Sequence, residues 1–279
     1  MDNSELRGCL EAMLSEDVGS GDVTSAFTPD REITAVITAD SDGIVSGIQE
    51  LSILFRSHGI RCTAHVADGR RVKAGMRVFT LRARARALLP VERTALNLIS
   101  RMSAVATLTR RYSDKLKALG SKSRIVATRK TTPLLRLLEK KAVVAGGGLP
   151  HRMGLYDMVL IKDNHLMLFG GDVRAAVAKA RASVKGLKVE VEVESIDDAL
   201  AAACAGADLV MFDNMRPSDI GWAVALIRGA GLRRKVLFEV SGGVTLGNLH
   251  HYALLGVDWI STGKITHSAP NVDFSMSVI

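Results

Sequence analysis

The chain lacks several features that would place it in a specialised class of protein. Aromatic residues make up only 4% of its 279 residues, which leaves little for stacking on unpaired bases. No apolar run approaches the length that a membrane-spanning helix needs. The opening residues, MDNSELRGCL, have neither the basic nor the apolar region of a secretory signal peptide. These absences predict a globular protein of the cytoplasm.

Cysteine is also scarce, and the three that occur, Cys9, Cys62 and Cys204, lie far apart. Their spacing fits neither a zinc site nor a CxxC redox pair, so we expect reduced thiols. The chain does have an ordinary hydrophobic content of 47% and a net charge of +8. It is long enough for one large domain or two smaller ones. Its positive charge suits nucleic acid and anionic metabolites equally well, so charge alone decides nothing.

The first part of the chain predicts a mixed α/β domain. A short helix is expected over 4–14, followed by a tight loop over 16–25. Pro90 is well placed to open a long amphipathic helix over 91–120, because its missing N–H would be unpaired there anyway. Between them, β-branched segments punctuated by glycine predict strands over 33–39, 43–48, 60–67 and 76–86, with a helix over 49–58.

Arg82, Arg84 and Arg86 alternate in the last of these segments and would share one strand face. A solvated face is the simplest interpretation. The alternative is a nucleic-acid-binding surface that also uses 233-RRK-235, although no aromatic residues are interleaved with these cations. Such binding would weaken steeply with salt.

After Gly120 the pattern alternates regularly between strand and helix, which predicts a parallel sheet with right-handed crossovers. No GxGxxG follows the first of these strands, so a dinucleotide-binding sheet is disfavoured. The expected fold is a (β/α) barrel with fewer than eight strands, and 142–152 has room for a seventh. The predicted strands are 124–127, 158–161, 188–193, 208–212, 235–240 and 258–261, and the helices are 133–145, 172–185, 196–205, 217–229 and 245–255.

Polar residues recur where these strands end, and barrels place their chemistry at the carboxyl ends of strands. Arginine matches a carboxylate with a planar fork, and lysine adds a point charge. The stretches 128-TRKTTP-133, 151-HR-152 and 161-IKDNH-165 therefore predict a cationic pocket for a small anion. The strand-end residues are Arg129, Lys130, Lys162, Glu192, Asp213, Ser241 and Thr262.

Glu192 and Asp213 follow successive strands and suit Mg²⁺ or sugar hydroxyls, although they could also simply balance nearby cations. Glu190 and Glu194 share the strand face of Glu192, and the sequence does not distinguish among the three. The glycine loops 240-VSGGVT-245 and 261-STGKITHS-268 come after the last two strands. In barrels these loops commonly bind phosphate, and glycines before a helix expose N–H groups to it.

Nearly the whole chain resembles the quinolinate phosphoribosyltransferase family, also called nicotinate-nucleotide pyrophosphorylases (carboxylating). The resemblance is carried, in order, by 14-LSEDVGSGDVTS-25, 92-ERTALNLISRMSAVAT-107, 128-TRKTTP-133, 146-GGG-148, 151-HR-152, 161-IKDNH-165, 188-KVEVEVE-194, 212-FDN-214, 241-SGG-243 and 263-GKITHS-268. It implies a type II phosphoribosyltransferase-like α/β fold. An N-terminal α/β sandwich domain over 1–106, joined by 269–279, would accompany an incomplete (β/α) barrel catalytic domain over 107–268.

The resemblance also implies the reaction. Quinolinate and phosphoribosyl pyrophosphate would give nicotinate mononucleotide, pyrophosphate and CO₂, with Mg²⁺, in de novo NAD biosynthesis. The expected assembly is a homodimer or larger homo-oligomer whose sites form between subunits, with no nucleic-acid or membrane partner.

Residue roles carry over by matched position. Quinolinate's carboxylates would be held by Arg129, His151, Arg152 and Lys162, and by Arg93 from the neighbouring subunit. Lys130 would add charge near the pyrophosphate or the carboxylates, and the expected catalytic set is Lys130, Lys162, Glu192 and Asp213. Glu192 and Asp213 would engage the ribose and Mg²⁺. The remaining substrate-binding residues, with the 5-phosphate cradle, would be Thr128, Ser241, Gly242, Gly243, Thr262, Gly263 and His267.

One departure from the family pattern is Leu134, which stands where glycine usually follows TTP. It would affect rate or substrate fit, by crowding a turn or filling the core. Three rival activities remain: phosphoribosyl transfer to nicotinate or another aromatic acid, a lyase using Lys162 as a Schiff base, and nucleic-acid binding. A paralogue linked to molybdenum transport lacks the TTP and KDNH segments that this chain keeps.

Overall fold

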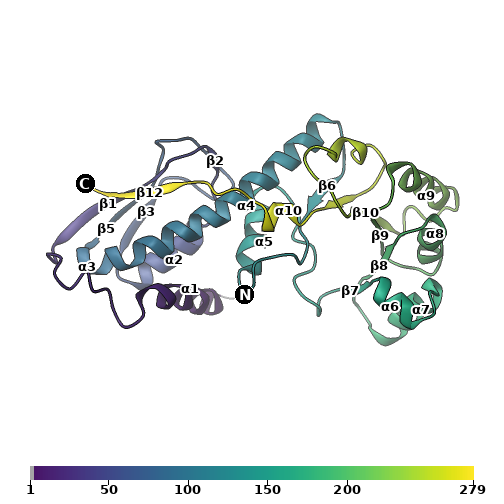
Figure 1. The fold of residues 1–279 in the computed structure, drawn as a ribbon, viewed down its shortest axis with the longest axis horizontal. Helices are drawn as coiled ribbons and strands as arrows, with labels where there is room; N and C mark the ends of the chain where they lie inside the picture. The colour runs from purple at the N-terminus through teal and green to yellow at the C-terminus, as the bar shows by residue number, and fades with distance from the viewer. Residues whose placement is uncertain (1–2) are drawn as a thin grey trace. The chain divides into compact units, whose positions relative to one another are not determined.

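The computed structural model describes residues 3–279, and the chain divides into two compact units (Figure 1). Unit 1 comprises Met1–Leu108, Val144–Gly146 and Ala269–Ile279. Unit 2 comprises Thr109–Val143 and Gly147–Ser268. Within the described range, none of the helices combines the length and hydrophobicity needed to cross a bilayer.

Unit 1 is built on a four-stranded antiparallel sheet in the order β12-β1-β5-β3. Its outer strand β12 comes from the end of the chain, so the last residues belong to this unit. The remaining elements include a two-stranded ladder of β2 and β4. The bounds are α1 Asn3–Val18, β1 Glu32–Ala39, β2 Gly43–Ile44, α2 Ile48–Ser57, β3 Arg61–Ala64, β4 Arg71–Val72, β5 Arg77–Arg84, α3 Ala85–Leu88, η1 Leu89–Val91, α4 Glu92–Ala118 (which continues into unit 2) and β12 Phe274–Val278.

The strand expected over 43–48 is much shorter than predicted. The N–H of Ile44 donates to Thr107 Oγ1 at 2.8 Å, and the N–H of Ser46 donates to Ser103 Oγ at 3.0 Å. Hydroxyls of α4 therefore take the place of a neighbouring strand, which a sequence pattern cannot reveal. The helix predicted over 4–14 is longer than expected, reaching Val18, so it includes the start of the predicted loop.

Unit 2 is built on a six-stranded parallel sheet in the order β6-β11-β10-β9-β8-β7, so all six predicted strands are present and parallel. Leu149 adds a parallel bridge to Val126 of β6, in the region where a seventh strand had room. Among residues 3–279 no ladder joins that edge to β7, so the barrel is incomplete. The strands are β6 Arg124–Val126, β7 Val159–Ile161, β8 Val189–Val193, β9 Leu209–Asp213, β10 Leu237–Ser241 and β11 Trp259–Ser261.

The helices of unit 2 agree with the predicted alternation of strands and helices except at two places. An unpredicted helix follows β7, and the helix predicted over 245–255 is wrong: only the short 3₁₀ turn η2 forms there. Thr245 and Asn248 exchange side-chain-to-backbone hydrogen bonds of 2.8 and 3.2 Å, the reciprocal pattern that caps a helix start, but the turn that they open continues only as η2. The bounds are α5 Arg136–Ala145, α6 Asp163–Leu168, α7 Val173–Ser183, α8 Ile196–Cys204, α9 Pro217–Gly229, η2 Leu249–His251 and α10 Lys264–His267.

Candidate active site

A cavity of about 450 Å³ opens at the carboxyl ends of the parallel strands in unit 2. Its volume lies within the range of small-molecule sites. Most of the predicted site residues line it, because successive strands bring their ends to one edge of the sheet. Those residues are Thr128, Arg129, Lys130, His151, Arg152, Lys162, Glu192, Asp213, Ser241, Gly242 and Gly243.

Two arginines in this cavity are poorly neutralised by the protein. Arg129 Nε is buried and has no hydrogen-bond partner among the described residues. Arg152 donates from Nη1 to the carbonyl of Met158 at 3.3 Å. Burial, and then the charge of Arg129, lower the pKa of the Arg152 guanidinium. Two cations that repel each other beside an empty volume are suited to an anion with more than one negative oxygen.

Lys162, the residue directly after β7, forms an ion pair with Glu192 of β8, and both line the cavity. His165 of the same KDNH motif does not line the cavity. Its Nδ1 accepts the N–H of Lys162 at 3.0 Å, so it caps helix α6. The motif therefore supplies one cavity residue and one cap.

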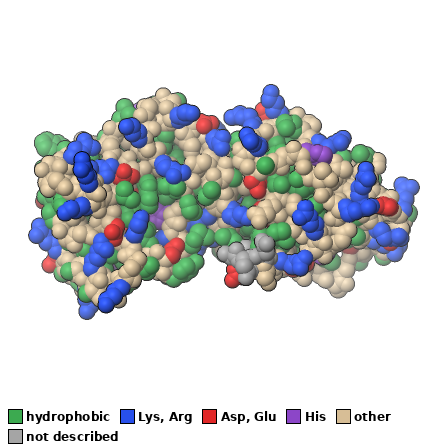
Figure 2. Space-filling view, turned by 180° about the vertical axis from the view of Figure 1, so that it is seen from behind, with side chains coloured by type: hydrophobic (Ala, Val, Ile, Leu, Met, Phe, Trp, Pro, Cys, Tyr) green, Lys and Arg blue, Asp and Glu red, His purple; other side chains and the backbone are tan. Residues whose placement is uncertain are grey.

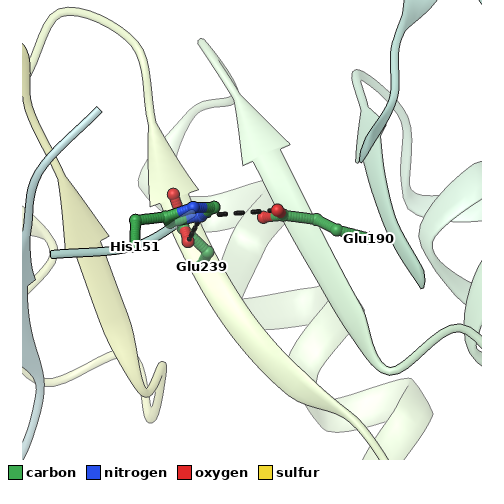
Figure 3. Close-up of side chains that lie close together, drawn as sticks. All are labelled: His151, Glu190 and Glu239. Carbon is green, nitrogen blue, oxygen red and sulfur yellow. Dashed lines mark hydrogen bonds and ion pairs between the residues drawn. The ribbon is translucent and has the colours of Figure 1, made fainter. Parts of the chain in front are cut away.

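His151, the residue before Arg152, lies close to two buried glutamates, Glu190 on β8 and Glu239 on β10 (Figure 3). Its Nε2 is 3.1 Å from Glu239 Oε2 and 3.4 Å from Glu190 Oε2, and both carboxylates are almost fully buried. Its Nδ1 accepts the N–H of Arg152 at 2.7 Å. The ring is thus held from both sides, and its backbone is in the left-handed region, with φ of 53°.

The protons of this cluster are shared. Burial lowers the pKa of His151, but Glu190 and Glu239 outweigh it and raise that pKa to about 9. Burial, and then Glu239, raise the pKa of Glu190 to about 7. An imidazolium with two carboxylates holds as many protons as a neutral imidazole with one protonated glutamate. The bond from the Arg152 N–H needs a lone pair on Nδ1, which favours the second arrangement.

Asp213 lies at the carboxyl end of β9, and its carboxylate accepts a bond of 2.7 Å from the side chain of Asn214. With Glu192 it supplies carboxylate oxygens on one wall of the cavity. Mg²⁺ typically takes one or two carboxylates together with substrate phosphate oxygens. The donor set of this wall therefore fits a magnesium ion bound jointly with a phosphorylated substrate.

The turn after β10 requires glycine. Gly242 has φ of 85°, and a Cβ there would lie 2.2 Å from Asn214 Oδ1. Gly243, with φ of 60°, follows directly, so the backbone itself faces the cavity. Because no α-helix starts at residue 245, this loop does not have the helix N-terminus that the sequence argument assumed.

Thr262, Gly263 and His267 do not line this cavity. The Thr262 hydroxyl donates to the Val244 carbonyl at 3.0 Å, which is a structural role. Gly263 packs closely beneath Lys130, since a Cβ there would lie 3.0 Å from Lys130 Cδ and from the ring of His267. His267 therefore lies next to a cavity residue without being one. Arg93 belongs to unit 1 and is in helix α4.

Sequence reasoning missed Glu239 and left Glu190 unresolved among its neighbours. Both are fully buried, which sets them apart from the exposed Glu194. A signal was present for Glu239, because it is the one acid in the apolar strand 235-KVLFEV-240, two residues before Ser241. Residues two apart in a strand share one face, so Glu239 lies on the same face as Ser241, which lines the cavity. It also missed Lys140, which is 1% exposed.

The arginine stripe of unit 1 differs from its prediction. Arg86 does not share the strand face of Arg82 and Arg84, because β5 ends at Arg84 and α3 begins. Arg84 pairs with Asp30 at 2.7 Å, and Arg86 donates to the carbonyls of Thr28 and Ala26. Figure 2 shows Lys and Arg side chains dispersed over the face drawn rather than gathered into a track. These features favour a solvated surface over a nucleic-acid site.

Comparisons with known proteins show the family and the fold of this chain. The family model described as quinolinate phosphoribosyl transferase, N-terminal domain, matches residues 22–103, and its C-terminal domain model matches 105–277. The chain is 42% identical to a probable nicotinate-nucleotide pyrophosphorylase [carboxylating] of Archaeoglobus fulgidus, over 93% of this chain and 98% of the relative. It is 37% identical to the nicotinate-nucleotide pyrophosphorylase [carboxylating] of Mycobacterium leprae, over 98% and 96%. The structure of the nicotinate-nucleotide pyrophosphorylase from Francisella tularensis superposes with a TM-score of 0.91 and 35% identity, covering 100% of this chain and 98% of that one.

Proposed function

The chain belongs to the quinolinate phosphoribosyltransferase family, and from this we infer that it is a carboxylating nicotinate-nucleotide pyrophosphorylase. It is a pentosyltransferase of de novo NAD biosynthesis. It transfers phosphoribose from phosphoribosyl pyrophosphate to quinolinate and releases pyrophosphate and CO₂. The observation that carries this conclusion is the family match over both units, joined to a cavity whose cations and acids suit these substrates.

Quinolinate is a pyridine dicarboxylate, and the cationic wall of the cavity supports its binding there. Arg129 and Arg152 repel each other and would be neutralised by its two carboxylates, with Lys162 as a third cation. Nicotinate, with one carboxylate, would leave one of the two guanidiniums uncompensated. The cavity therefore favours quinolinate over nicotinate.

The phosphorylated sugar occupies the part of the cavity around the glycine turn after β10. Gly242 and Gly243 bring backbone close to its 5-phosphate, Ser241 adds a hydroxyl, and Lys130 lies toward the pyrophosphate. Glu192 and Asp213 face the ribose and the Mg²⁺ ion, for which their carboxylates are suitable ligands. When bound, the ion offsets negative charge on the departing pyrophosphate.

The reaction needs charge stabilisation at two points. As pyrophosphate leaves, positive charge develops on the ribose ring, and the carboxylates of Glu192 and Asp213 stabilise it. The pyridine nitrogen then bonds to the ribose and becomes cationic. The bond from ring carbon 2 to its carboxylate breaks, CO₂ departs, and the electron pair left on carbon 2 beside the cationic nitrogen takes up a proton.

A borohydride-trappable Schiff base at Lys162 has less support, because the Lys162 ammonium is engaged by Glu192. We propose that the working form is a homodimer or larger homo-oligomer in which Arg93 of a neighbouring subunit completes the carboxylate site. We also propose a cytoplasmic location, which is compatible with the free thiols of Cys9, Cys62 and Cys204.

A product assay tests the proposed function. Purified protein would receive phosphoribosyl pyrophosphate and Mg²⁺, with quinolinate or nicotinate, and CO₂ and mononucleotide would be measured. We expect product from quinolinate, and a loss of about 100-fold or more in kcat for Asp213→Asn, which keeps the shape but removes the charge. Asp197→Asn, in the first turn of α8 outside the cavity, is the matched control. Product from nicotinate alone would overturn the decarboxylating assignment.

A further inference from the structure

The residues proposed to hold the carboxylates lie in two segments without regular secondary structure. Arg129 and Lys130 follow β6, and His151 and Arg152 precede β7. The sheet ladders do not include these four residues, since the ladder of β6 ends before Arg129 and the ladder of β7 begins after Arg152. Catalytic geometry nevertheless tolerates little displacement, because a misplacement of about 1 Å can cost roughly 100-fold in rate. Something else must position the segments.

Lys140 of helix α5 holds the second segment. Its Nζ donates to the Pro150 carbonyl at 2.6 Å and also to the Arg152 carbonyl. The two carbonyls flank His151, whose φ of 53° is a left-handed conformation that costs about 1–2 kcal/mol in a residue other than glycine. Lys140 thus bridges a strained residue from both sides, and at 1% exposure it is shielded from water.

The same helix also contacts the first segment. Glu139, fully buried, accepts the Thr132 hydroxyl at 2.9 Å and the Thr132 N–H at 3.2 Å. Arg136 donates to Thr131 Oγ1 and to the Met153 carbonyl, both at 3.1 Å. The start of α5 therefore contacts both cationic segments through the side chains of Arg136, Glu139 and Lys140.

We propose that Lys140 is a positioning residue for quinolinate: it fixes the segment Pro150–Arg152 so that Arg152 meets the substrate carboxylate. The proposal rests on the function proposed above. Lys140 is not a catalytic residue, because it does not line the cavity. Its effect reaches the substrate through the backbone that carries His151 and Arg152.

The choice of a lysine has a physical reason. Methionine would fill a similar volume, but it would leave two buried carbonyls without a donor. Burying an ammonium is costly, and the bonds to the two carbonyls offset part of that cost. A buried lysine therefore adds little to the free energy of unfolding, and this fits a role in positioning the site rather than in stabilising the fold.

The test compares binding of the two substrates to wild type and Lys140→Met. Quinolinate dissociation constants would be measured by calorimetry without phosphoribosyl pyrophosphate, and KM values for both substrates would be measured in the product assay. We expect quinolinate binding to weaken about tenfold or more, because Arg152 is displaced. The KM for phosphoribosyl pyrophosphate should change less than about twofold, because the glycine turn after β10 is held independently.

Ile227→Ala is the control for lost stability, because Ile227 is fully buried in α9 and lies outside the cavity. It should lower the melting temperature without changing the ratio of the two KM values. If Lys140→Met does not fold, Lys140→Gln, which retains a shorter donor, is measured instead and should show a smaller shift in the same direction. Equal weakening of both substrates, or normal quinolinate binding, would overturn the proposal. A wild type inactive on quinolinate would instead overturn the proposed function itself.

Discussion

The two groups of arginines in this chain look alike in sequence but differ in how the protein satisfies them. In unit 1, Arg84 binds the carboxylate and carbonyl of Asp30, and Arg86 binds two carbonyls of the preceding loop. In unit 2, Arg129 Nε has no partner among the described residues, and Arg152 is repelled by Arg129. The arginines of unit 1 are thus engaged by acceptors of that unit, whereas Arg129 keeps a buried donor without a partner within residues 3–279 and lines the cavity. That difference is the one that marks a binding site.

The largest expected effect comes from removing one of the two arginines that line the cavity. Arg152→Ala should lower kcat/KM for quinolinate by about 100-fold to 1,000-fold, because a desolvated carboxylate would lose its charged partner. Arg84→Ala in unit 1 is the matched control and should stay within about twofold of wild type. Steady-state kinetics on both variants measure the difference. Similar losses in the two variants would contradict the distinction between the arginines of the cavity and those of unit 1.

A smaller effect concerns the pH dependence of the free energy of unfolding, and it comes from Lys140, which is buried, unlike the exposed cations. Burial, and then the charge of Arg136, lower the pKa of Lys140 from 10.5 to about 8. Between these values the unfolded chain binds a proton that the folded chain does not, so stability rises with pH. The gain relative to Lys140→Met is up to about 3 kcal/mol and is complete above pH of about 10.5.

Urea unfolding of both proteins from pH of about 7.5 to about 10 measures this gain. Other titrating groups largely cancel in the difference between wild type and variant. A difference that is flat across this range would mean that Lys140 keeps its ordinary pKa.

The smallest effect tests the turn that follows the cationic segment of unit 2. The Leu135 N–H donates to the Thr132 carbonyl at 3.1 Å, with Pro133 and Leu134 between them, and Leu134 has φ of 65°. A turn of this kind favours glycine at the third position. Leu134 is also 93% exposed, so it does not fill the core.

Leu134→Gly should therefore raise stability by about 1 kcal/mol or less, or roughly 2–4 °C in melting temperature. Leu134→Ala is the control, because it removes the side chain but retains the Cβ and its strain. Thermal unfolding measures both variants. A gain in the alanine variant equal to that in the glycine variant would show that the exposed side chain, rather than the backbone, is responsible.

Local patterns were enough to locate the strands of unit 2 and most of the cavity. Apolar runs followed at once by Lys162, Glu192 or Asp213 indicate a strand and its functional end together. The helix expected at 245–255 extends no further than η2, even though Thr245 and Asn248 form the reciprocal bonds of a helix cap. The strand expected over 43–48 shortened because its N–H groups bond to hydroxyls of α4, about 60 residues away. Hydrogen bonds of this second kind are not encoded in the periodicity of the sequence.

By itself, the sequence determined the family, the alternation of strands and helices, and the residue types at the strand ends, because these depend on local pattern and motif order. Only the tertiary structure decided which of those polar groups are satisfied. It paired Arg84 with Asp30, buried Glu190 and Glu239 around His151, and left Arg129 Nε without a partner. The reason is physical: burial and hydrogen bonding depend on contacts between segments distant in the chain, and these contacts decide whether a charge is part of the scaffold or is left for a substrate.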